Sequence, residues 1–446
     1  MQRHSLLLIK ILLALAFVVE LGMITYWRKS WGDYGSPMLW FVAALLTALL
    51  PLLWTAYSEG PQSLLKSPPR WRKFLLPGVA LAGLLCVAPL LPPVFEVMPL
   101  TVDNSDITPQ IRVLVQRFLR GEMPYQPITD WGYELFSPYM PLQWLPFVLP
   151  EVAGFDYRWM AYAVFLLAAA LFALYLSRLE LPLALQLSLA ATPALFLWLL
   201  TNPLHFTILG RTVELLIAGY YLLLALSILS QSDAVRALGL LLCLLSKYVI
   251  LFWLPLYALA VLLYDRKSSA LRIALFVAGG LLLLYVLPFM TRDPAIFMKG
   301  YAYHQQVTFG LWHPMYWQPP DAKPFLLFEG MGFAGWFYDT LSGGIAEKQR
   351  ILGLVQWGGS LAVVILSGLW FYVHLHKKLG YRIFLLLSLK LYLSWFYAFI
   401  ALPYEYYYIV PLVVSLVVIA EVWSWRPVYE GFAYIRPLAD PADAAT

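Results

Sequence analysis

Hydrophobic and polar residues follow one another along this chain in long blocks, not singly. Apolar runs of about 20 residues, the length that crosses a bilayer as a helix, occur at 6–27, 37–57, 74–92, 159–177, 182–201, 205–230, 270–290, 351–374, 381–402 and 406–425. They lack the alternation of single residues that is typical of a transmembrane β-strand. We predict an all-α polytopic membrane protein, with a single transmembrane domain over 1–446 and about eleven to thirteen transmembrane helices.

Two other apolar segments leave the number of crossings open. One, 139–153, is short and rich in proline, and the other, 236–264, is long. If 139–153 crosses, Arg178 and Arg236 fall on the outer side. If it only enters the interface, both arginines are cytoplasmic, as basic residues tend to be, but 236–264 must then turn back on itself. We favour the second arrangement, which brings Lys247 near the outer leaflet.

Charge assigns the two sides of the membrane. The chain is 61% hydrophobic and only 12% charged, against about 25% charged residues in soluble domains. Basic residues cluster in three connections, at 66–73, 265–272 and 374–382. Such clusters are typically cytoplasmic, so the net charge of +5 does not indicate nucleic-acid binding. The loops at 93–138 and 291–350, with 403–408, are then outer, and the tail at 426–446 is cytoplasmic.

The outer loop at 93–138 is unusually polar for this chain. We predict a surface helix at 109–120, because Ile111, Leu114, Val115, Phe118 and Leu119 form one apolar stripe opposite arginines and glutamine. Asp106 lies just before it. An aspartate there is typical of a helix start that the helix dipole stabilises. The same position would also hold a catalytic carboxylate at the membrane boundary.

Several segments now suggest a family. "SDITPQIRVLVQRFLRGEMPY" and "FSPYMPLQWLPFVLP" resemble the first outer loop of GT-C glycosyltransferases. The resemblance is strongest to the polyprenyl-phosphate-mannose-dependent α-mannosyltransferases of phosphatidylinositol mannoside and lipoglycan synthesis. "ILGRTVELLIAGYYLLLAL", "LGLLLCLLSKYVILFWLPL" and "ALPYEYYYIVPLVV" are similar to later segments of that family, in the same order. The GT-C-like region covers 75–425. Arg211 departs from the family, which usually has glutamine there.

The resemblance implies a reaction. A sugar, mannose or another hexose, would pass from a polyprenyl-phosphate donor to an envelope glycan or lipid acceptor by an inverting single displacement. The family's outer-loop aspartate corresponds to Asp106, which would act as general base. Asp103 would support it or replace it. The site would lie on the outer face of the inner (cytoplasmic) membrane, and the mannosyltransferase branch implies no metal and no cofactor.

Other residues are candidates for binding the donor. Lys247 interrupts an apolar run, where a lysine is costly and typically functional, and it would stabilise charge on a departing phosphate; the alternative is a lysine that reaches the interface. We also assign Arg211 to donor binding, although it could instead form an i,i+3 pair with Glu214. His304 and Gln305 lie among aromatic residues that suit sugar rings; an interfacial aromatic belt is the alternative, but it does not explain the histidine.

The resemblance adds Tyr125 and Glu405 as supporting residues. Two other classes of function remain. A transporter or flippase for lipid-linked saccharides would concentrate polar groups in broken helices near the bilayer midplane. A polymerase of lipid-linked saccharides would also carry arginines and an acid in outer loops. It is not expected to have an aspartate at the start of a surface helix.

Overall fold

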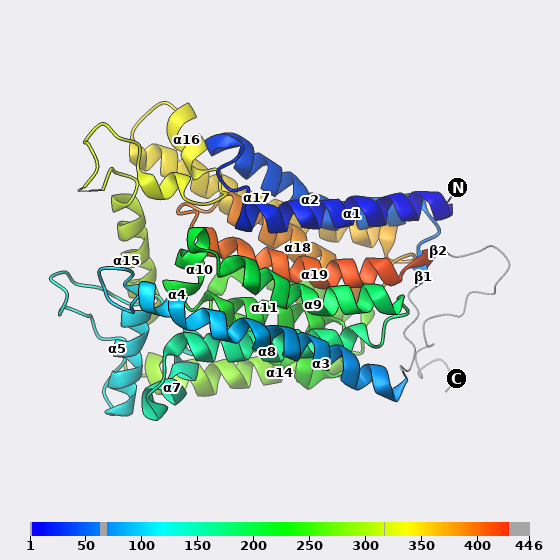
Figure 1. Ribbon diagram of the computed structural model, residues 1–446, viewed down its shortest axis with the longest axis horizontal. Coiled ribbons are helices and arrows are strands. Elements are labelled where there is room, and N and C mark those ends of the chain that lie inside the picture. Colours follow the sequence, from blue (N-terminus) through cyan, green and yellow to red (C-terminus); the bar gives the residue numbers. More distant parts are fainter. Residues whose placement is uncertain (1, 63–68, 316, 428–446) are drawn as a thin grey trace.

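The structure, a computed structural model, describes residues 2–62, 69–315 and 317–427. Nearly all of the predicted tail at 426–446, and residues 66–68 of the first basic cluster, lie outside the described residues. Long helices run side by side along the longest axis of the molecule (Figure 1). They are α1 (Gln2–Thr25), α2 (Gly32–Tyr57), α3 (Arg70–Val87), α8 (Tyr157–Leu176), α9 (Leu183–Leu200), α11 (Glu214–Ile228), α14 (Lys267–Leu281), α17 (Ile345–Trp370), α18 (Tyr381–Ala398) and α19 (Ile409–Ser424).

Three of these helices continue past a change of pitch. α3 is followed by η1 (Ala88–Leu90) and α4 (Leu91–Val97), α14 by η5 (Leu282–Met290), and α17 by η7 (Phe371–Leu375). Within the described ranges, eight helical segments are long and apolar enough to cross a membrane. The prediction of an all-α polytopic membrane protein is therefore confirmed. The predicted total of about eleven to thirteen transmembrane helices stays a prediction. It depends on whether α11, α18 and the segment at 233–264 also cross the membrane.

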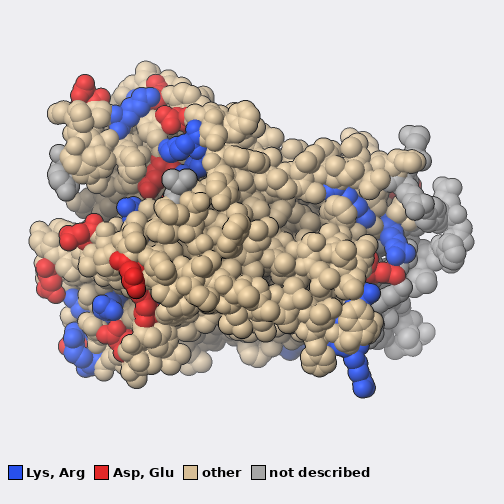
Figure 2. Space-filling view, in the orientation of Figure 1, with Lys and Arg blue, Asp and Glu red and all other residues tan. Residues whose placement is uncertain are grey.

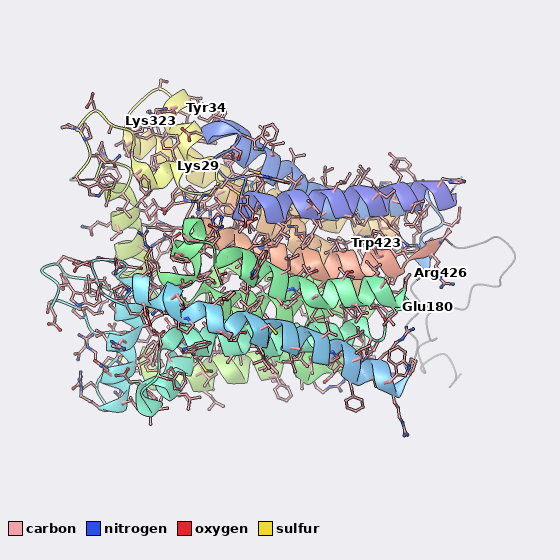
Figure 3. The ribbon with its side chains drawn as sticks, viewed as in Figure 1. Lys29, Tyr34, Glu180, Lys323, Trp423 and Arg426 are labelled. Carbon is pink, nitrogen blue, oxygen red and sulfur yellow. The ribbon has the colours of Figure 1, made fainter. Side chains whose placement is uncertain are left out.

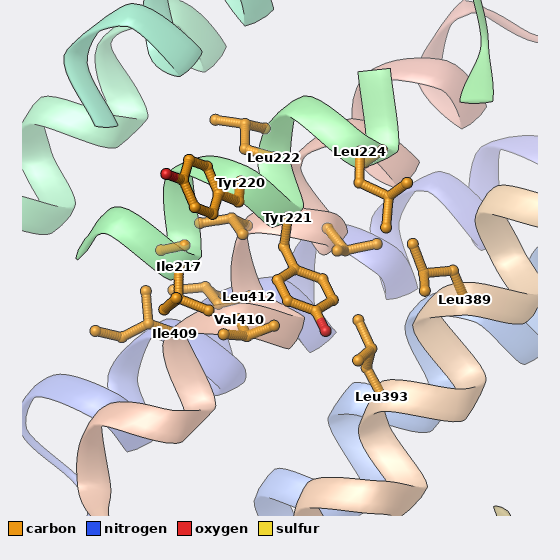
Figure 4. Packing of buried hydrophobic residues seen from close by; sticks show 14 of the residues in the cluster. Ile217, Tyr220, Tyr221, Leu222, Leu224, Leu389, Leu393, Ile409, Val410 and Leu412 are labelled. Atoms are coloured by element: carbon orange, nitrogen blue, oxygen red, sulfur yellow. The ribbon is translucent and has the colours of Figure 1, made fainter. Parts of the chain in front are cut away.

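The centre of the bundle is apolar. Leucine, valine and tyrosine side chains of α11, α18 and α19 pack against one another (Figure 4). Tyr221 and Leu393 are fully buried there, as is Val410. On the face shown in Figure 2, a broad uncharged band separates two ends where charged side chains gather. That band is the surface that an apolar bundle presents to lipid.

The two ends of the bundle differ. The end that carries the antiparallel pair β1 (Pro61–Gln62) and β2 (Arg426–Pro427) also holds the predicted cytoplasmic clusters, and we call it the basic end. There Lys378 donates to the Ser58 carbonyl at 2.7 Å. Tyr381 donates to Asp265 at 2.6 Å. The opposite end carries the predicted outer loops, and we call it the loop end.

The segment at 236–264 turns back on itself. It comprises α12 (Asp233–Leu244), η4 (Tyr248–Phe252) and α13 (Leu254–Tyr264). Arg236, near the start of α12, donates to Asp265 just after α13 at 2.8 Å, so both ends of the hairpin lie at the basic end. Lys247 lies at the turn, with an extended backbone. It is therefore at the tip of a hairpin, as the favoured arrangement of the sequence analysis predicts.

The segment at 139–153 does not cross the bundle. It forms α6 (Pro141–Trp144), η2 (Leu145–Phe147) and α7 (Val148–Ala153), which are too short to span. The Leu142 backbone amide donates to the Leu245 carbonyl at 2.7 Å, which joins this segment to the hairpin tip. Both segments thus adopt the arrangement in which Arg178 and Arg236 share the basic end.

Short helices cover the loop end, and α5 (Ile107–Leu119) and α15 (Ile296–Gly310) run across the long helices (Figure 1). The others are η3 (Pro203–His205), α10 (Phe206–Gly210), η6 (Phe325–Phe328), α16 (Ala334–Thr340) and η8 (Glu405–Tyr408). α5 lies where the sequence predicts a helix at 109–120. Ile111, Leu114 and Val115 are fully buried, but Phe118 and Leu119 are exposed, so the predicted stripe is covered only in its first part.

The loop between α1 and α2, and the first turn of α2, bind the second outer loop. Lys29 donates to the Phe328 carbonyl. Tyr34 and Lys323 both bond Asp339. Figure 3 shows Lys29, Tyr34 and Lys323 together at this end, and Glu180 and Arg426 at the other. The outer loop at 291–350 is therefore held against the N-terminal helices.

Accessible cysteines test which end faces outward. Thr129→Cys and Asp321→Cys, both exposed at the loop end, are expected to react with a membrane-impermeant thiol reagent added to intact cells, in a chain whose exposed Cys86 is replaced by serine. Lys377→Cys, exposed at the basic end, is expected to react only after the membrane is opened. Labelling of Lys377→Cys in sealed cells would reverse the orientation.

Candidate functional site

Asp106 stands at the N-terminal boundary of α5. Its backbone carbonyl accepts the Gln110 amide at 2.9 Å, but its side chain makes no capping bond to the helix. Burial raises the pKa of Asp106, and a hydrogen bond from the Gln110 side chain opposes that shift. A carboxyl group with a raised pKa titrates closer to neutral pH, which favours proton exchange with a hydroxyl.

Four tyrosines lie within electrostatic range of this carboxyl group. Burial, and after it the negative charge of Asp106, raise the pKa of Tyr133, of Tyr139 and of Tyr404. The same two causes raise the pKa of Tyr303 to about 12. These residues come from the stretch between α5 and α6, from α15 and from the loop before η8, so three separate segments lie near Asp106. Hydroxyls and aromatic faces of this kind suit a sugar ring.

Lys247 has a carboxylate partner. Its ammonium nitrogen lies 2.6 and 2.9 Å from the two carboxylate oxygens of Glu214, and 4.6 Å from the centre of the Tyr407 ring. Because Lys247 binds Glu214, the alternative of an i,i+3 pair between Arg211 and Glu214 is wrong. The reason is geometric: Glu214 is the first residue of α11, and its carboxylate contacts Lys247 at the hairpin tip. Lys247 is therefore a paired cation, and its contact with a phosphate stays a prediction.

His304 lies near this pair. Burial lowers the pKa of His304, and the positive charge of Lys247 lowers it further. Burial raises the pKa of Tyr139 most, and the negative charges of Asp106 and Glu214 each raise it further. Asp106, Lys247 and His304 are thus brought to one region of the loop end, although they come from different segments.

A second cluster contains Arg211 and Glu405. The Glu405 carboxylate forms an ion pair with Arg28 and accepts a hydrogen bond from Thr207. Burial raises the pKa of Glu329, and Arg211 is the first of the cations that oppose the shift, before Arg28. The Nε of Arg211 is buried and has no hydrogen-bond partner within the described residues. Arg211 is therefore the better placed of the two predicted cations to accept an anion.

Tyr404 connects the two clusters. Its pKa is raised by burial, then by Asp106 and then by Glu329. Arg211 and Glu214 flank the short break between α10 and α11, so one stretch of chain supplies a residue to each cluster. The predicted catalytic and donor-binding residues therefore belong to neighbouring clusters at the loop end.

Of the three other predicted supporting residues, two are exposed and one makes packing contacts. Asp103 and Gln305 are exposed. Tyr125 is buried; its hydroxyl donates to the Tyr139 carbonyl and accepts from the Trp144 indole, each at 3.0 Å. Through these hydrogen bonds Tyr125 stabilises the end of the outer loop, which is a packing role. Among the described residues, none of the three forms a hydrogen bond or ion pair with Asp106 or Lys247, and their support of the site stays a prediction.

Several residues of these clusters carry no signal in the local sequence. Arg28 and Glu329 lie in loops, and Thr207 and His205 lie in short helices. Neither ring nitrogen of His205 has a partner within the described part of the chain, and burial followed by the charge of Arg28 lowers its pKa. Arg28 stands just after the first apolar run, where a basic residue is ordinary, so only its long-range pairing reveals it.

The described residues contain no group of three or more histidine, cysteine, aspartate or glutamate side chains able to hold a metal ion. No protein-family model, curated protein or solved structure matches the chain.

Proposed function

We propose that the protein is a membrane glycosyltransferase that moves a sugar, mannose or another hexose, from a polyprenyl-phosphate donor to a hydroxyl of an envelope glycan or lipid. The observation that carries the proposal is the position of Asp106. A carboxyl group with a raised pKa stands at the start of α5, within electrostatic range of four tyrosines. It lies at the end of an apolar bundle that is remote from the basic clusters, where an aqueous acceptor and a lipid phosphate can meet.

The chemistry is a single displacement. The acceptor hydroxyl oxygen forms a bond to the anomeric carbon, and the bond from that carbon to the phosphate oxygen breaks with inversion. Asp106 takes the hydroxyl proton as the bond forms. The phosphate leaves with the bonding electrons and gains charge, which a cation stabilises. Arg211 supplies that cation in this proposal, and Lys247 adds to it if phosphate displaces Glu214. Neither a metal nor a cofactor takes part in this scheme.

Lys390 bears on the transporter alternative. It pairs with Glu20 at 2.6 Å, and both side chains are wholly buried. Thr47 and Ser415 donate to the same carboxylate at 2.7 and 3.1 Å. This polar group is enclosed within unbroken helices, whereas a transport site is expected in broken ones. Its satisfied bonds favour a structural role, and the polar groups of the loop end favour the enzyme.

The direct test is to incubate the purified protein with radiolabelled polyprenyl-phosphate sugars and membrane lipids of the host. We expect label to move to a lipid or glycan product as polyprenyl phosphate is released. Asp106→Asn protein is the matched control. Movement of intact donor across a sealed bilayer without transfer would instead indicate a flippase, and a ladder of products a polymerase.

A further inference from the structure

Arg158 is an arginine whose bonding capacity is fully used. It is 4% exposed and lies in the first turn of α8. Its Nε and one Nη bind the two carboxylate oxygens of Asp156 at 2.9 and 2.6 Å. The remaining N–H groups donate to the carbonyls of Met98 at 2.7 Å, Gly210 at 2.9 Å and Phe95 at 3.2 Å. A guanidinium group has five N–H donors, and all five are engaged here.

The bound carbonyls belong to two segments that lead into the candidate site. Phe95 lies in the last turn of α4 and Met98 directly follows that helix, and the chain then runs through a short loop to Asp106. Gly210 ends α10 and immediately precedes Arg211. Carbonyls at helix ends lack partners within their own helix, so Arg158 satisfies groups that would otherwise be unbonded.

A close approach brings the two segments together. A Cβ atom at Gly210 would lie 2.6 Å from the Cβ of Met98, which is shorter than side chains tolerate. The contact between α4 and α10 therefore depends on glycine at this position. The Arg158 guanidinium also lies 4.0 Å from the centre of the Phe95 ring, which adds a cation–π interaction.

We propose that Arg158 is a positioning residue: it holds the α4 end and the α10 end in one geometry, and so fixes where Asp106 stands relative to Arg211. This inference rests on the proposed function, because the two segments carry its general base and its phosphate-binding cation. The planar fork of arginine is required. Lysine has at most three donors on one nitrogen and cannot bind three carbonyls and a carboxylate together.

Two variants disturb the junction in different ways. Arg158→Lys keeps the charge but loses the fork, and Gly210→Ala keeps Arg158 but forces Met98 away. We expect each to lower the kcat for transfer by about 10²-fold, the scale of a misplacement of about 1 Å in a reacting pair. Rates are normalised to the number of folded donor-binding molecules. Loss of stability alone would reduce that number and leave the normalised kcat unchanged.

Arg236→Lys is the matched control. Arg236 is equally buried, at 2% exposed, and binds Asp233, Asp265 and Ser269, but it lies at the basic end. We expect Arg236→Lys to lower the thermal unfolding midpoint and to keep the normalised kcat. An equal fall in normalised kcat for Arg236→Lys and Arg158→Lys would refute a positioning role.

A distance measurement separates this inference from the proposed function. Spin labels at Thr101→Cys and Pro203→Cys, both exposed, report on the loop before Asp106 and on the start of η3, in a chain with Cys86 replaced by serine. Arg158→Lys is expected to broaden the distance distribution by double electron–electron resonance, and Arg236→Lys is not. If broadening occurs but no polyprenyl-phosphate sugar is ever transferred, the junction is correct and the proposed function is wrong. If wild-type protein transfers sugar while Arg158→Lys keeps both kcat and distribution, the positioning role is wrong.

Discussion

Replacing Asp106 with asparagine is expected to lower sugar transfer by about 10²-fold or more, the usual scale for loss of a general base. Asparagine keeps the size of the side chain and can bond Gln110, but it cannot accept the hydroxyl proton. The fold and the affinity for the donor should therefore be retained. The measurement compares transfer rate, thermal unfolding midpoint and donor binding of the purified variant with those of wild type.

Asp103→Asn is the control for this experiment. Asp103 is exposed and lies on the same loop, so a similar loss of charge there should have a much smaller effect. The opposite order would make Asp103 the base, and full activity in both variants would remove the proposed mechanism.

If Asp106 is the general base, its pKa also determines how transfer depends on pH. Burial raises the pKa of Asp106, and only the ionised form accepts a proton. Transfer should therefore rise with pH through that raised pKa and reach a plateau above it. The groups that face Asp106 and titrate far above this range are Tyr133, Tyr139, Tyr303 and Tyr404. Asp106→Asn is expected to abolish this acid limb.

The sequence predicts those parts of the fold that local patterns determine. Long apolar runs predict the spans, and the amphipathic pattern predicts α5 to within two residues at its start and one at its end, since Ile107–Leu119 replaces 109–120. The turn of 236–264 also follows from local information, because basic residues on both sides of it require the same end. These signals depend on residues that are close in the chain.

The candidate site depends on contacts that no local pattern contains. Lys247 lies at the hairpin tip and Glu214 at the start of α11, and Arg28 meets Glu405 from the opposite part of the chain. Arg158 appears in the sequence as an ordinary basic residue near a helix start, and only the carbonyls around it reveal its bonds. Asp106, Lys247, His304 and Arg211 can thus be predicted singly from the sequence, but which of the two cations is already paired cannot.

The pairing of Lys247 with Glu214 changes how its role must be tested. Lys247→Met alone removes a cation and also leaves Glu214 buried without its partner, which is destabilising by about 3–5 kcal/mol in buried pairs. A fall in activity would then have two explanations. Glu214→Gln alone leaves Lys247 free of its carboxylate, so it should tighten donor binding if the ammonium contacts phosphate.

The double variant Lys247→Met/Glu214→Gln separates these explanations. Removing both charges leaves no unpaired ion, so the thermal unfolding midpoint should recover most of what Lys247→Met loses. Transfer should stay low, by about 10²-fold, because the cation that stabilises the leaving phosphate is still missing. The control is Lys390→Met/Glu20→Gln, a wholly buried pair enclosed by Thr47 and Ser415 within the bundle, which should change the midpoint while donor affinity stays the same. If the Lys247→Met/Glu214→Gln protein instead regains wild-type transfer and donor affinity, Lys247 serves only to neutralise Glu214. Arg211 would then be the cation on which phosphate binding depends.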